Sequence, residues 1–541
     1  MERLHFPWLQ VGILLPLLGA IWTRTRRDPD VERRHGLIVS ALTLGCMIGA
    51  WVDFKLLGAH EARDLWDPFS LLWEHDLLAI DGLNAPLLAM GSLVYYLTIL
   101  STLRTKAGEF SISWTLLSEA VLLATFAAAT PWGVVTMMSI GALPPYVELL
   151  RRRRPSRIYL AHMGLFVALL ILGEYGVSRA DSSAGRSLGP ILLLTIATLL
   201  RSGVAPVHYW MTDLFEHATF GRALLFVTPM VGAYGVIRLV LPIAPDWILE
   251  VISIMSLFTA IYAAGMALIQ REARRFFCYL FLSHSSLVLV GIETATPIGL
   301  TASLSLLLSV SLSLTGFGLA LRCVEARVGR CLMTEFHGLY DHIPMMAGLF
   351  LLSGLASIGF PGTAGFVGLD LLVNAAARAM PFIGISIVIV AALNGLAVIQ
   401  AYFRIFTGPP RSTSIDLRIG PSERIAILII SALILGAGIY PRAGVSDRHE
   451  AAVRLLRARA VGEAPPPPEA RRLRNGPSRP DHPSALEERT APLGFSPTSL
   501  GRRMVASSRA RAANSSGWLG ARARLTRSGI SGSKGRVGMQ T

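Results

Sequence analysis

Long, nearly uninterrupted apolar runs dominate the chain as far as residue 441. Most of them hold about 16 to 25 residues between charged residues, prolines or glycines, which is close to the length that a helix needs to cross a bilayer. The runs predicted to span the membrane are 6–22, 37–52, 83–103, 112–130, 132–150, 158–177, 189–207, 220–243, 247–270, 276–294, 298–322, 343–377, 381–406 and 422–441. The pattern predicts an all-α polytopic membrane protein with about 14 transmembrane helices.

Basic residues are distributed unevenly between the two sides of these helices. Most lysines and arginines before residue 443 follow odd-numbered runs, for example Arg24, Arg33 and the cluster at 151–154. Because basic loops stay in the cytoplasm, we expect both ends of the helical part outside it, together with the acidic loop 53–82. The first run has no small-residue cleavage site and is predicted to be a retained helix. We expect a multi-pass protein of the inner (cytoplasmic) membrane of a bacterium.

Composition excludes a water-soluble globular enzyme. Of 541 residues, 52% are hydrophobic and 16% charged, whereas soluble proteins carry about 25% charged residues. The four cysteines form no C-x-x-C pair and have no histidine partner at zinc spacing. We therefore expect no cofactor, no iron–sulfur cluster and no structural metal in this chain.

Residues 445–541 differ from the rest of the chain. They are rich in arginine, serine, glycine and alanine and include a run of four prolines at 465–468. Such a composition does not bury a core, so a basic, disordered tail is expected. Arginine-rich segments bind nucleic acid or anionic lipid in some proteins, but no aromatic platform accompanies these arginines. An unstructured extension is favoured, and no nucleic-acid partner is expected.

Proline and glycine interrupt three of the apolar runs. Gly203 and Pro206 lie in LLRSGVAPVHYW, Pro229 lies in ALLFVTPMVGAYG, and Pro361 and Gly362 lie in GLASIGFPGTAGFVGLDLLV. A helix that breaks within the membrane leaves main-chain polar groups without partners, and many transporters build ion sites from such groups. These positions predict broken helices around a hydrated interior.

Ionisable residues near the first break are candidates for a proton path, because a charge within a membrane is costly unless it is paired or hydrated. Arg201 precedes Gly203, where it either lines a hydrated cavity or extends to the cytoplasmic edge. His208, Asp213 and Glu216 follow at the expected cytoplasmic mouth. A solvated loop explains these three nearly as well as a site where protons enter.

Further candidates lie in other runs. His284 has three serines around it and an ordinary pKa suited to relaying protons, although a histidine packed against hydroxyl groups is more often structural. Asp370 follows the third break and either faces the interior or lies at a helix end near the external surface. Glu119 is a further acid within a run, and Glu148 is expected to pair with the arginines at 151–154.

Five segments between about residues 78 and 410 share motifs with a known family. LLRSGVAPVHYWMTDLFEHATFGRALLF resembles the pattern K-S-x-x-x-P-x-H-x-W-L-P-D-A-x-E-x-P-T, and the matching positions are His208, Trp210, Asp213, Glu216 and Thr219. IDGLNAPLL, ARRFFCYLFLSHSS, GFPGTAGFVGLDLL and LNGLAVIQAYFRIFTG resemble four further motifs in the same order. The family is that of the antiporter-like proton-translocating membrane subunits of respiratory complex I (NADH-quinone oxidoreductase), shared with multisubunit sodium/proton antiporters and membrane-bound hydrogenases.

The resemblance implies fourteen helices with two inverted five-helix repeats, each containing a broken helix, and a hydrophilic axis through the membrane centre. Protons are thought to move along that axis between glutamate, lysine and histidine side chains. With this likeness the chain divides into two N-terminal helices and an external loop (1–77), an antiporter-like core (78–410), a last transmembrane helix (411–444) and the tail (445–541).

The chain departs from the family at the residues that carry protons. The family's fifth-helix glutamate, seventh-helix lysine, eighth-helix histidine, central lysine and exit lysine align, in that order, with Ser139, Arg201, Phe226, Thr315 and Leu369. The whole chain holds three lysines, and none lies in an apolar run. Arginine stays protonated, so it orders water but does not pass on its own proton. The usual relay is therefore incomplete.

Two functions follow from the resemblance. In the first, the chain is a membrane subunit of a complex I-like NADH/quinone oxidoreductase or a cation/proton antiporter assembly. It would translocate protons through His208, water ordered by Arg201, His284 and Asp370. In the second, it is a non-conducting structural paralogue that docks a partner, for example in a bicarbonate-uptake complex. The missing charges favour the second function, and the retained mouth motif and helix breaks favour the first.

In either case the expected partners are other membrane subunits and the lipid bilayer. NADH and quinone would be handled by partner subunits that carry flavin and iron–sulfur centres. The chain itself would act as a translocase subunit without a redox centre of its own.

Overall fold

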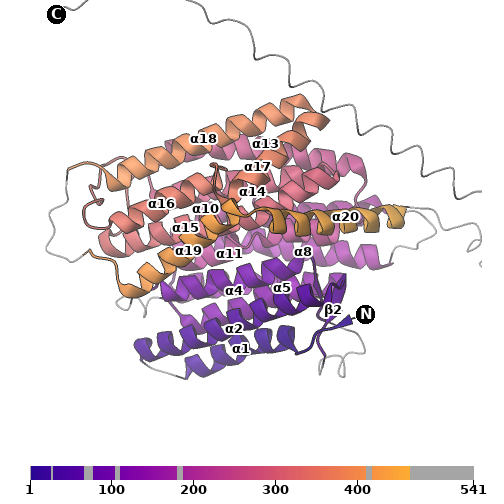
Figure 1. Cartoon of the computed structure of the whole chain (residues 1–541), viewed down its shortest axis with the longest axis horizontal. Helices are drawn as coiled ribbons and strands as arrows, with labels where there is room; N and C mark the ends of the chain where they lie inside the picture. Colours follow the sequence, from indigo (N-terminus) through magenta and orange to yellow (C-terminus); the bar gives the residue numbers. More distant parts are fainter. Residues whose placement is uncertain are drawn as a thin grey trace, which may run out of the picture. The chain divides into compact units, whose positions relative to one another are not determined.

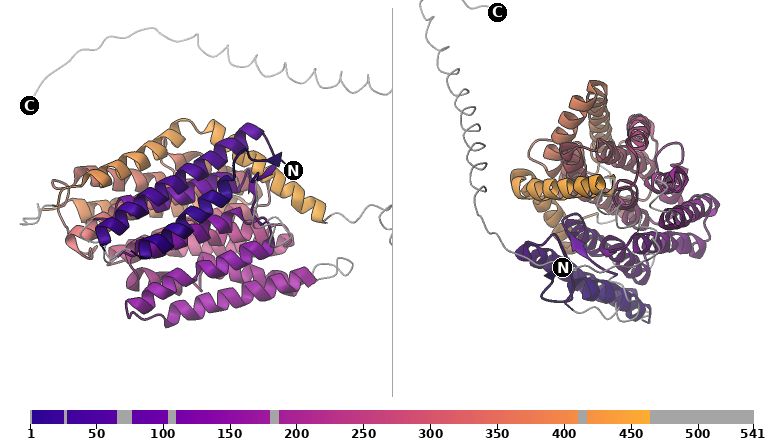
Figure 2. Two further views of the ribbon diagram at one scale, coloured as in Figure 1. Left: turned by 90° about the horizontal axis from the view of Figure 1, so that it is seen from below. Right: turned by 90° about the vertical axis from the view of Figure 1, so that its right-hand side faces the viewer.

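The computed structural model is built almost entirely from helices that lie side by side with similar axis directions (Figure 1). The right-hand view in Figure 2 shows many of the same helices nearly end-on. The residues that the structure describes are 2–25, 28–65, 77–103, 110–179, 187–409 and 417–463. The part of the predicted tail beyond residue 463 lies outside the described residues.

Local chemistry explains where several helices begin and end. Helix α2 (Pro29–Leu57) begins with the Asp28 carboxylate accepting a hydrogen bond from the amide of its second residue at 2.9 Å. It ends at Gly58, whose φ of 61° suits a residue without a side chain. Helices α6 (Pro131–Gly141) and α15 (Pro297–Val328) both start after a threonine hydroxyl that accepts an amide hydrogen bond at 3.1 Å. Proline in the first helical position fits all three starts.

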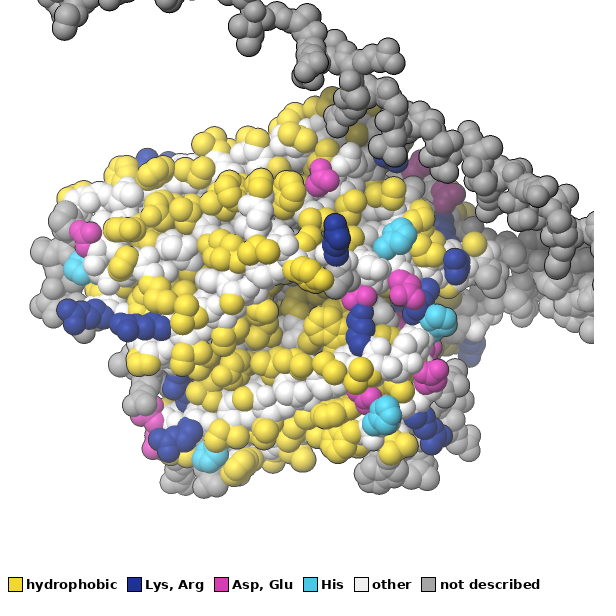
Figure 3. Space-filling view, in the orientation of Figure 1, with side chains coloured by type: hydrophobic (Ala, Val, Ile, Leu, Met, Phe, Trp, Pro, Cys, Tyr) yellow, Lys and Arg dark blue, Asp and Glu magenta, His cyan; other side chains and the backbone are white. Residues whose placement is uncertain are grey.

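Among the described residues, eight further helices are uninterrupted and also coincide with apolar runs of the sequence. They are α1 (Trp8–Arg24), α4 (Asn84–Leu100), α5 (Ile112–Ala127), α8 (Arg157–Arg179), α13 (Asp246–Ile269), α14 (Ala273–Glu293), α18 (Pro381–Phe406) and α19 (Pro421–Ile439). Within the described ranges, nine helices are long and apolar enough to cross a membrane, and five apolar helices are shorter. Hydrophobic side chains cover the middle of the face in Figure 3, and many charged ones lie toward its two ends. The prediction of a helical, multi-pass membrane protein is confirmed.

Several helices are interrupted within an apolar run. Helix α6 is followed by α7 (Leu143–Arg151), and α9 (Leu188–Ser202) is followed by α10 (Tyr209–His217). The run 220–243 forms three segments: α11 (Phe220–Val227), α12 (Val231–Gly235) and the π-helix η2 (Val236–Val240). Helix α16 (Pro344–Ser357) is followed by α17 (Ala364–Ala379). Gly203, Gly359 and Gly362 have φ of 77°, 77° and 84°, and Met230, after Pro229, has φ of 51°. The Ala205–Pro206 peptide bond is cis. The structure thus has an interruption at each place where proline and glycine predicted one.

A small sheet, absent from the all-α prediction, joins loop segments at one end of the helices. Its strands are β1 (Glu2–Arg3), β2 (Glu61–Arg63) and β3 (Ile80–Asp81). They lie in the order β1-β2-β3, with β1 parallel and β3 antiparallel to β2. Segments this short have no apolar periodicity, so only the folded chain reveals their pairing.

The IDGLN motif links the start of α4 to the broken helix around η2. The Asp81 carboxylate accepts hydrogen bonds from the amides of Leu83 at 2.9 Å and Asn84 at 2.8 Å. Its other oxygen accepts one from Arg238 at 2.7 Å, and Arg238 also donates to the Tyr234 hydroxyl at 3.0 Å. Arg238, which lies in an apolar run, therefore has an acidic partner in strand β3, just before α4.

The prediction of a disordered segment from residue 445 onward is wrong for residues 445–463. They belong to helix α20 (Arg442–Glu463), which packs against α15. Asp447 forms an ion pair with Lys55 at the end of α2, and Ala451 and Ala452 are buried. The segment is basic overall, but small residues on one side allow it to lie closely against the other helices.

Candidate functional site

Arg201 lies in the last turn of α9, beside the interruption of the next apolar run. Its side chain is buried and donates a hydrogen bond from Nη2 to the carbonyl oxygen of Phe226 at 3.0 Å. The guanidinium also lies 3.9 Å from the ring centre of Phe226 and 5.6 Å from that of Trp210. Arg201 is therefore held in the interior of the protein and does not extend to its surface.

The break at Pro229 explains why the Phe226 carbonyl is free to accept this bond. In a continuous helix this carbonyl would accept from the amide of Met230, four residues later. The Met230 amide instead donates to the carbonyl of Val227 at 3.0 Å. The broken helix thus offers a main-chain acceptor inside the protein, and the arginine of another helix occupies it.

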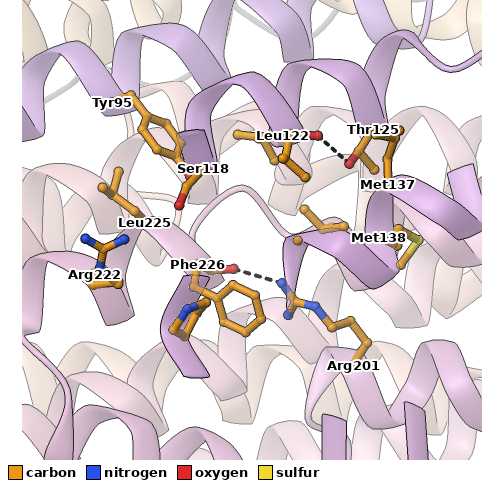
Figure 4. A pocket seen from close by; sticks show the side chains of 14 residues that line it. Tyr95, Ser118, Leu122, Thr125, Met137, Met138, Arg201, Arg222, Leu225 and Phe226 are labelled. Atoms are coloured by element: carbon orange, nitrogen blue, oxygen red, sulfur yellow. Dashed lines mark hydrogen bonds between the residues drawn. The ribbon is translucent and has the colours of Figure 1, made fainter. Parts of the chain in front are cut away.

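Arg201 lines a cavity between α4, α5, α6, α9 and α11 (Figure 4). The cavity volume is about 40 Å³, which is room for roughly two or three water molecules. Its polar lining comes from Tyr95, Ser118, Thr125, Arg201 and Arg222, and its other walls are apolar. Two cations and three hydroxyl groups facing one small space favour ordered water there.

Arg222, at the start of α11, is a cavity residue that the sequence interpretation missed. It is buried and forms an ion pair with Glu148 of α7. Glu148 also accepts a hydrogen bond from the amide of Thr219 at 2.8 Å. The expectation that Glu148 pairs with the arginines at 151–154 is therefore wrong. The position of Arg222 within the apolar run 220–243 was the only signal for it in the sequence.

A second acid lies near this cavity. Glu119 of α5 is fully buried, and one of its carboxylate oxygens accepts a hydrogen bond from the Ser40 hydroxyl at 3.1 Å. Its other oxygen has no hydrogen-bond partner within the described residues. The buried Tyr95 interacts electrostatically with Glu119, Arg201 and Arg222. The first half of the core therefore contains a group of ionisable side chains around one tyrosine.

The three mouth residues have different surroundings. His208 is buried against Tyr209, Tyr262 and Tyr279, with ring centres 4.6, 5.4 and 6.0 Å away. Because its ring packs in an aromatic cage, His208 is not part of a solvated loop. It follows the cis Ala205–Pro206 bond and precedes α10.

Asp213 and Glu216 lie on α10. The Asp213 carboxylate lies 3.1 Å from Nδ1 of His217, and that nitrogen also makes a 3.0 Å hydrogen bond to the Asp213 carbonyl oxygen. Burial raises the pKa of the Asp213 carboxyl group. Glu216 is ion-paired with Arg275, which holds the Glu216 pKa below its usual value. Arg330 donates to the Glu216 carbonyl oxygen at 2.7 Å. Glu216 therefore attaches α10 to neighbouring segments, which is a structural role.

A second cavity connects Arg201 with α14. Its volume is about 10 Å³, and its polar lining comes from Arg201, Ser202 and Ser285. His284, the neighbour of Ser285, is buried, and its Nε2 has no hydrogen-bond partner within the described ranges. A third cavity of about 10 Å³ contacts His284, Ser357 and Leu369. The structure thus brings Arg201 close to α14 and the His284 region close to α17.

Asp370 does not join these residues. Its side chain is exposed on α17, and only its neighbour Leu369 lines the cavity beside His284. Successive residues on a helix point about 100° apart, so the inward position of Leu369 turns Asp370 away. Of the two positions that the sequence left open for Asp370, the one facing the interior is therefore wrong.

The second half of the core contains hydroxyl groups where the family has its central lysine. Thr315 of α15 is buried and donates its hydroxyl to the carbonyl of Ser311 at 2.7 Å. Other buried hydroxyls have no hydrogen-bond partner among the described residues: Ser286, Ser303, Ser305, Ser311, Ser313 and Ser353. Buried hydroxyls usually bond to protein or to ordered water, so this region favours bound water over fixed charge.

The comparisons with known proteins agree with these features. Residues 159–394 match the family model described as NADH:quinone oxidoreductase/Mrp antiporter, TM. The chain is 27% identical over 485 residues to NAD(P)H-quinone oxidoreductase chain 4 1 of Synechococcus sp. (strain JA-3-3Ab), covering 82% of this chain and 91% of that one. It is 25% identical over 487 residues to NADH-quinone oxidoreductase subunit M of Pseudomonas aeruginosa, covering 81% and 94%.

Solved structures share the fold. A chain of respiratory complex I from Thermus thermophilus superposes with a TM-score of 0.73 at 20% identity, covering 83% of this chain and 99% of that one. A chain of the Mrp complex from Dietzia sp. DQ12-45-1b superposes with a TM-score of 0.71 at 19% identity, covering 83% and 98%. Together with the motifs and broken helices, these matches show that the chain is similar to the antiporter-like membrane subunits of NADH-quinone oxidoreductases and Mrp antiporters.

Proposed function

We propose that this chain is a proton-translocating membrane subunit of a multisubunit complex related to NADH-quinone oxidoreductase or to Mrp antiporters. The observation that carries the proposal is the position of Arg201. It is buried and lines two cavities, and it donates a hydrogen bond to the Phe226 carbonyl, which the helix break leaves without its usual helical partner. Any NADH and quinone chemistry of that complex would belong to partner subunits. The named relatives do not favour the alternative of a non-conducting scaffold.

The proposed arrangement in the membrane is fourteen crossings with two inverted five-helix repeats. Nine long and five shorter apolar helices support this number if α16 and α17 together make one crossing. The two proposed broken helices also resemble each other. Helix α9 ends before Gly203 and α16 ends before Gly359, and both glycines have φ of 77°. The positive-inside pattern supports a bacterial inner membrane, with both ends of the helical part outside the cytoplasm.

Domain boundaries remain part of this proposal. The antiporter-like core is proposed to cover residues 78–410, preceded by residues 1–77 and followed by a last crossing in 411–444. The matched family segment, residues 159–394, falls inside that core. Residues 445–463 form most of α20 and are grouped with the folded part.

The proposed proton route is shorter than the one usual for the family. Water in the cavity beside Arg201 would connect the Tyr95 and Glu119 region with Ser285 and His284 on α14. Arg201 keeps its charge, so it would orient this water without exchanging its own proton. The hydroxyl groups of α15 would continue the hydrated route in the second half.

The test is proton flux in liposomes that contain the chain with its native partner subunits. Arg201→Gln removes the charge and should reduce flux at least tenfold, because the buried water loses its fixed cation. Arg424→Gln is a matched control, since Arg424 is an exposed arginine of α19. Equal flux in wild type, Arg201→Gln and Arg424→Gln would contradict the proposed route. The absence of flux from the wild-type complex would contradict the translocating function.

A further inference from the structure

A cavity of about 280 Å³ lies between α20 and the ends of α2 and α4. It is much larger than the cavities near Arg201 and His284. Trp51, Phe54, Ala85 and Pro86 give it an apolar part. Its charged part is formed by Lys55, Asp447, Arg448, Glu450 and Arg454. The cavity therefore combines an apolar wall with a charged wall that carries three cations and two acids.

Two of the three cations already have acidic partners. Lys55 is paired with Asp447, and Arg454 is paired with Glu450 one helical turn away. Arg454 also lies 3.5 Å from the carbonyl oxygen of His60, to which it donates. These pairs neutralise both acids of the cavity, so the third cation carries the net positive charge.

That third cation is Arg448. Within the described part of the chain, Arg448 has no hydrogen-bond or ion-pair partner, although it is partly buried and lines the cavity. Burial lowers the pKa of its guanidinium, and the nearby Asp447 only partly opposes this effect. A desolvated arginine without a partner is costly, and a planar guanidinium is suited to binding the oxygens of a phosphate group.

The helix that carries Arg448 is fixed in place at several points. His449 and Thr301 share a hydrogen bond of 3.1 Å, and Arg459 donates to Asp246 at 2.5 Å. These contacts hold α20 against the ends of α13 and α15, so the cavity is part of the folded structure. Trp51 and Phe54 of its apolar wall lie in the last turns of α2, a candidate membrane helix. The end of a membrane helix is where a lipid would place its glycerol and upper acyl chain.

We infer that this cavity binds a phosphate-bearing anion, with the phosphate on Arg448, and that its apolar wall accommodates the glycerol region of an anionic phospholipid. Lys55 and Arg454 would add to the positive electrostatic potential at the phosphate. Their ion pairs with Asp447 and Glu450 hold the two side chains in place. Binding would attach α20 to the ends of α2 and α4. This inference is independent of proton translocation. The cavity beside α20 shares no lining residue with the cavities at Arg201 and His284.

The experiment measures ligand-dependent stabilisation of the purified complex in a neutral detergent. The probes are short-chain phosphatidylglycerol, short-chain phosphatidylcholine and inorganic phosphate, and the readout is the shift in Tm with probe concentration. The wild type should be stabilised by phosphatidylglycerol at concentrations at least tenfold lower than those needed for phosphatidylcholine. Stabilisation by inorganic phosphate alone would assign the site to a free anion.

Variants test whether Arg448 is responsible. Arg448→Gln should weaken the response to phosphatidylglycerol about tenfold, because one charge-assisted interaction is lost. Arg448→Lys keeps the charge and should retain part of the response, which separates lost binding from misfolding. Arg442→Gln, on an exposed arginine of the same helix, is the matched control and should respond as the wild type does. Unchanged responses in Arg448→Gln, or no preference among the three probes, would overturn the inference.

Discussion

Arg201 and Phe226 are joined by a hydrogen bond between a guanidinium and a main-chain carbonyl, 3.0 Å long and 25 residues apart in sequence. These two positions align with the lysine and histidine that the resemblance assigns to the family's proton path. The bond therefore connects two positions at which this chain differs from the family pattern. In this chain a permanent cation and a freed backbone acceptor stand where the family has two groups that exchange protons.

The first prediction concerns the chemistry of the cation at position 201. Lysine in a dry site can release its proton, whereas arginine keeps it. Arg201→Lys is therefore expected to retain at least the proton flux of the wild type, in contrast to Arg201→Gln. Flux is measured in the same liposomes that contain the native partner subunits. A loss of flux in Arg201→Lys equal to that in Arg201→Gln would mean that the hydrogen bond to Phe226, and not the charge, is essential.

The second prediction concerns the ion pair of Glu148 and Arg222. Their side chains are 12% and 6% exposed, so removal of the acid leaves a buried arginine without its charge partner. Glu148→Gln should destabilise the protein by about 3–5 kcal/mol, as breaking buried ion pairs does. The double variant Glu148→Leu/Arg222→Leu should recover much of this loss. Thermal unfolding in detergent measures both effects.

Glu450 provides the control for that comparison, because its pair with Arg454 is exposed. Glu450→Gln should change the unfolding temperature little, since exposed pairs contribute little to stability. Equal losses in Glu148→Gln and Glu450→Gln would show that the buried pair has no special role.

The third prediction concerns the glycine that ends α9. Gly203 has φ of 77°, and a Cβ atom there would lie 2.7 Å from the Cε of Met211. Gly203→Ala should cost about 1–2 kcal/mol from the backbone alone and should lower proton flux, because Arg201 is two residues away. Gly265→Ala is the control, since Gly265 lies inside α13 with nothing within 4 Å of its added Cβ. Gly265→Ala should be neutral or slightly stabilising, and a similar loss in both variants would contradict the explanation.

The fourth prediction is a pH dependence from the pair of Glu216 and Arg275. Arg275 holds the pKa of Glu216 below its usual value, so the pair stabilises the protein above the ordinary glutamate pKa of about 4.3. This contribution is lost as the pH falls through the lowered pKa. Unfolding temperatures between about pH 3 and 6 should therefore fall less steeply in Glu216→Gln than in the wild type. Parallel curves for the two proteins would contradict the pair's contribution.

Asp213 on the same helix should behave in the opposite way. Burial raises its pKa, so its contribution to stability is present at low pH and is lost as the pH rises through the raised value. Asp213→Asn should therefore gain stability relative to the wild type at neutral pH and not at pH 3. The same unfolding series measures this effect, and a loss of stability at neutral pH would contradict it.

The positions of the helices, their membrane character and their interruptions follow from the order of residues along the chain. The length of the apolar runs predicts membrane-spanning helices, because the backbone polar groups of each crossing must form hydrogen bonds within it. Proline and glycine fix the breaks near Gly203, Pro229 and Gly362, because proline lacks an amide donor and glycine tolerates a positive φ. These are local effects, and they act before any tertiary contact forms.

The contacts between side chains of different helices depend on how the chain folds. Glu148 has several arginines close by in sequence, yet its partner is Arg222, 74 residues away, because chain folding brings α7 and α11 together. Asp370 and Leu369 are neighbours in sequence, yet the packing of α17 turns only Leu369 inward. Burial and ion pairing depend on the rotation of each helix against its neighbours, and an apolar run of nearly uniform hydrophobicity leaves that rotation unspecified.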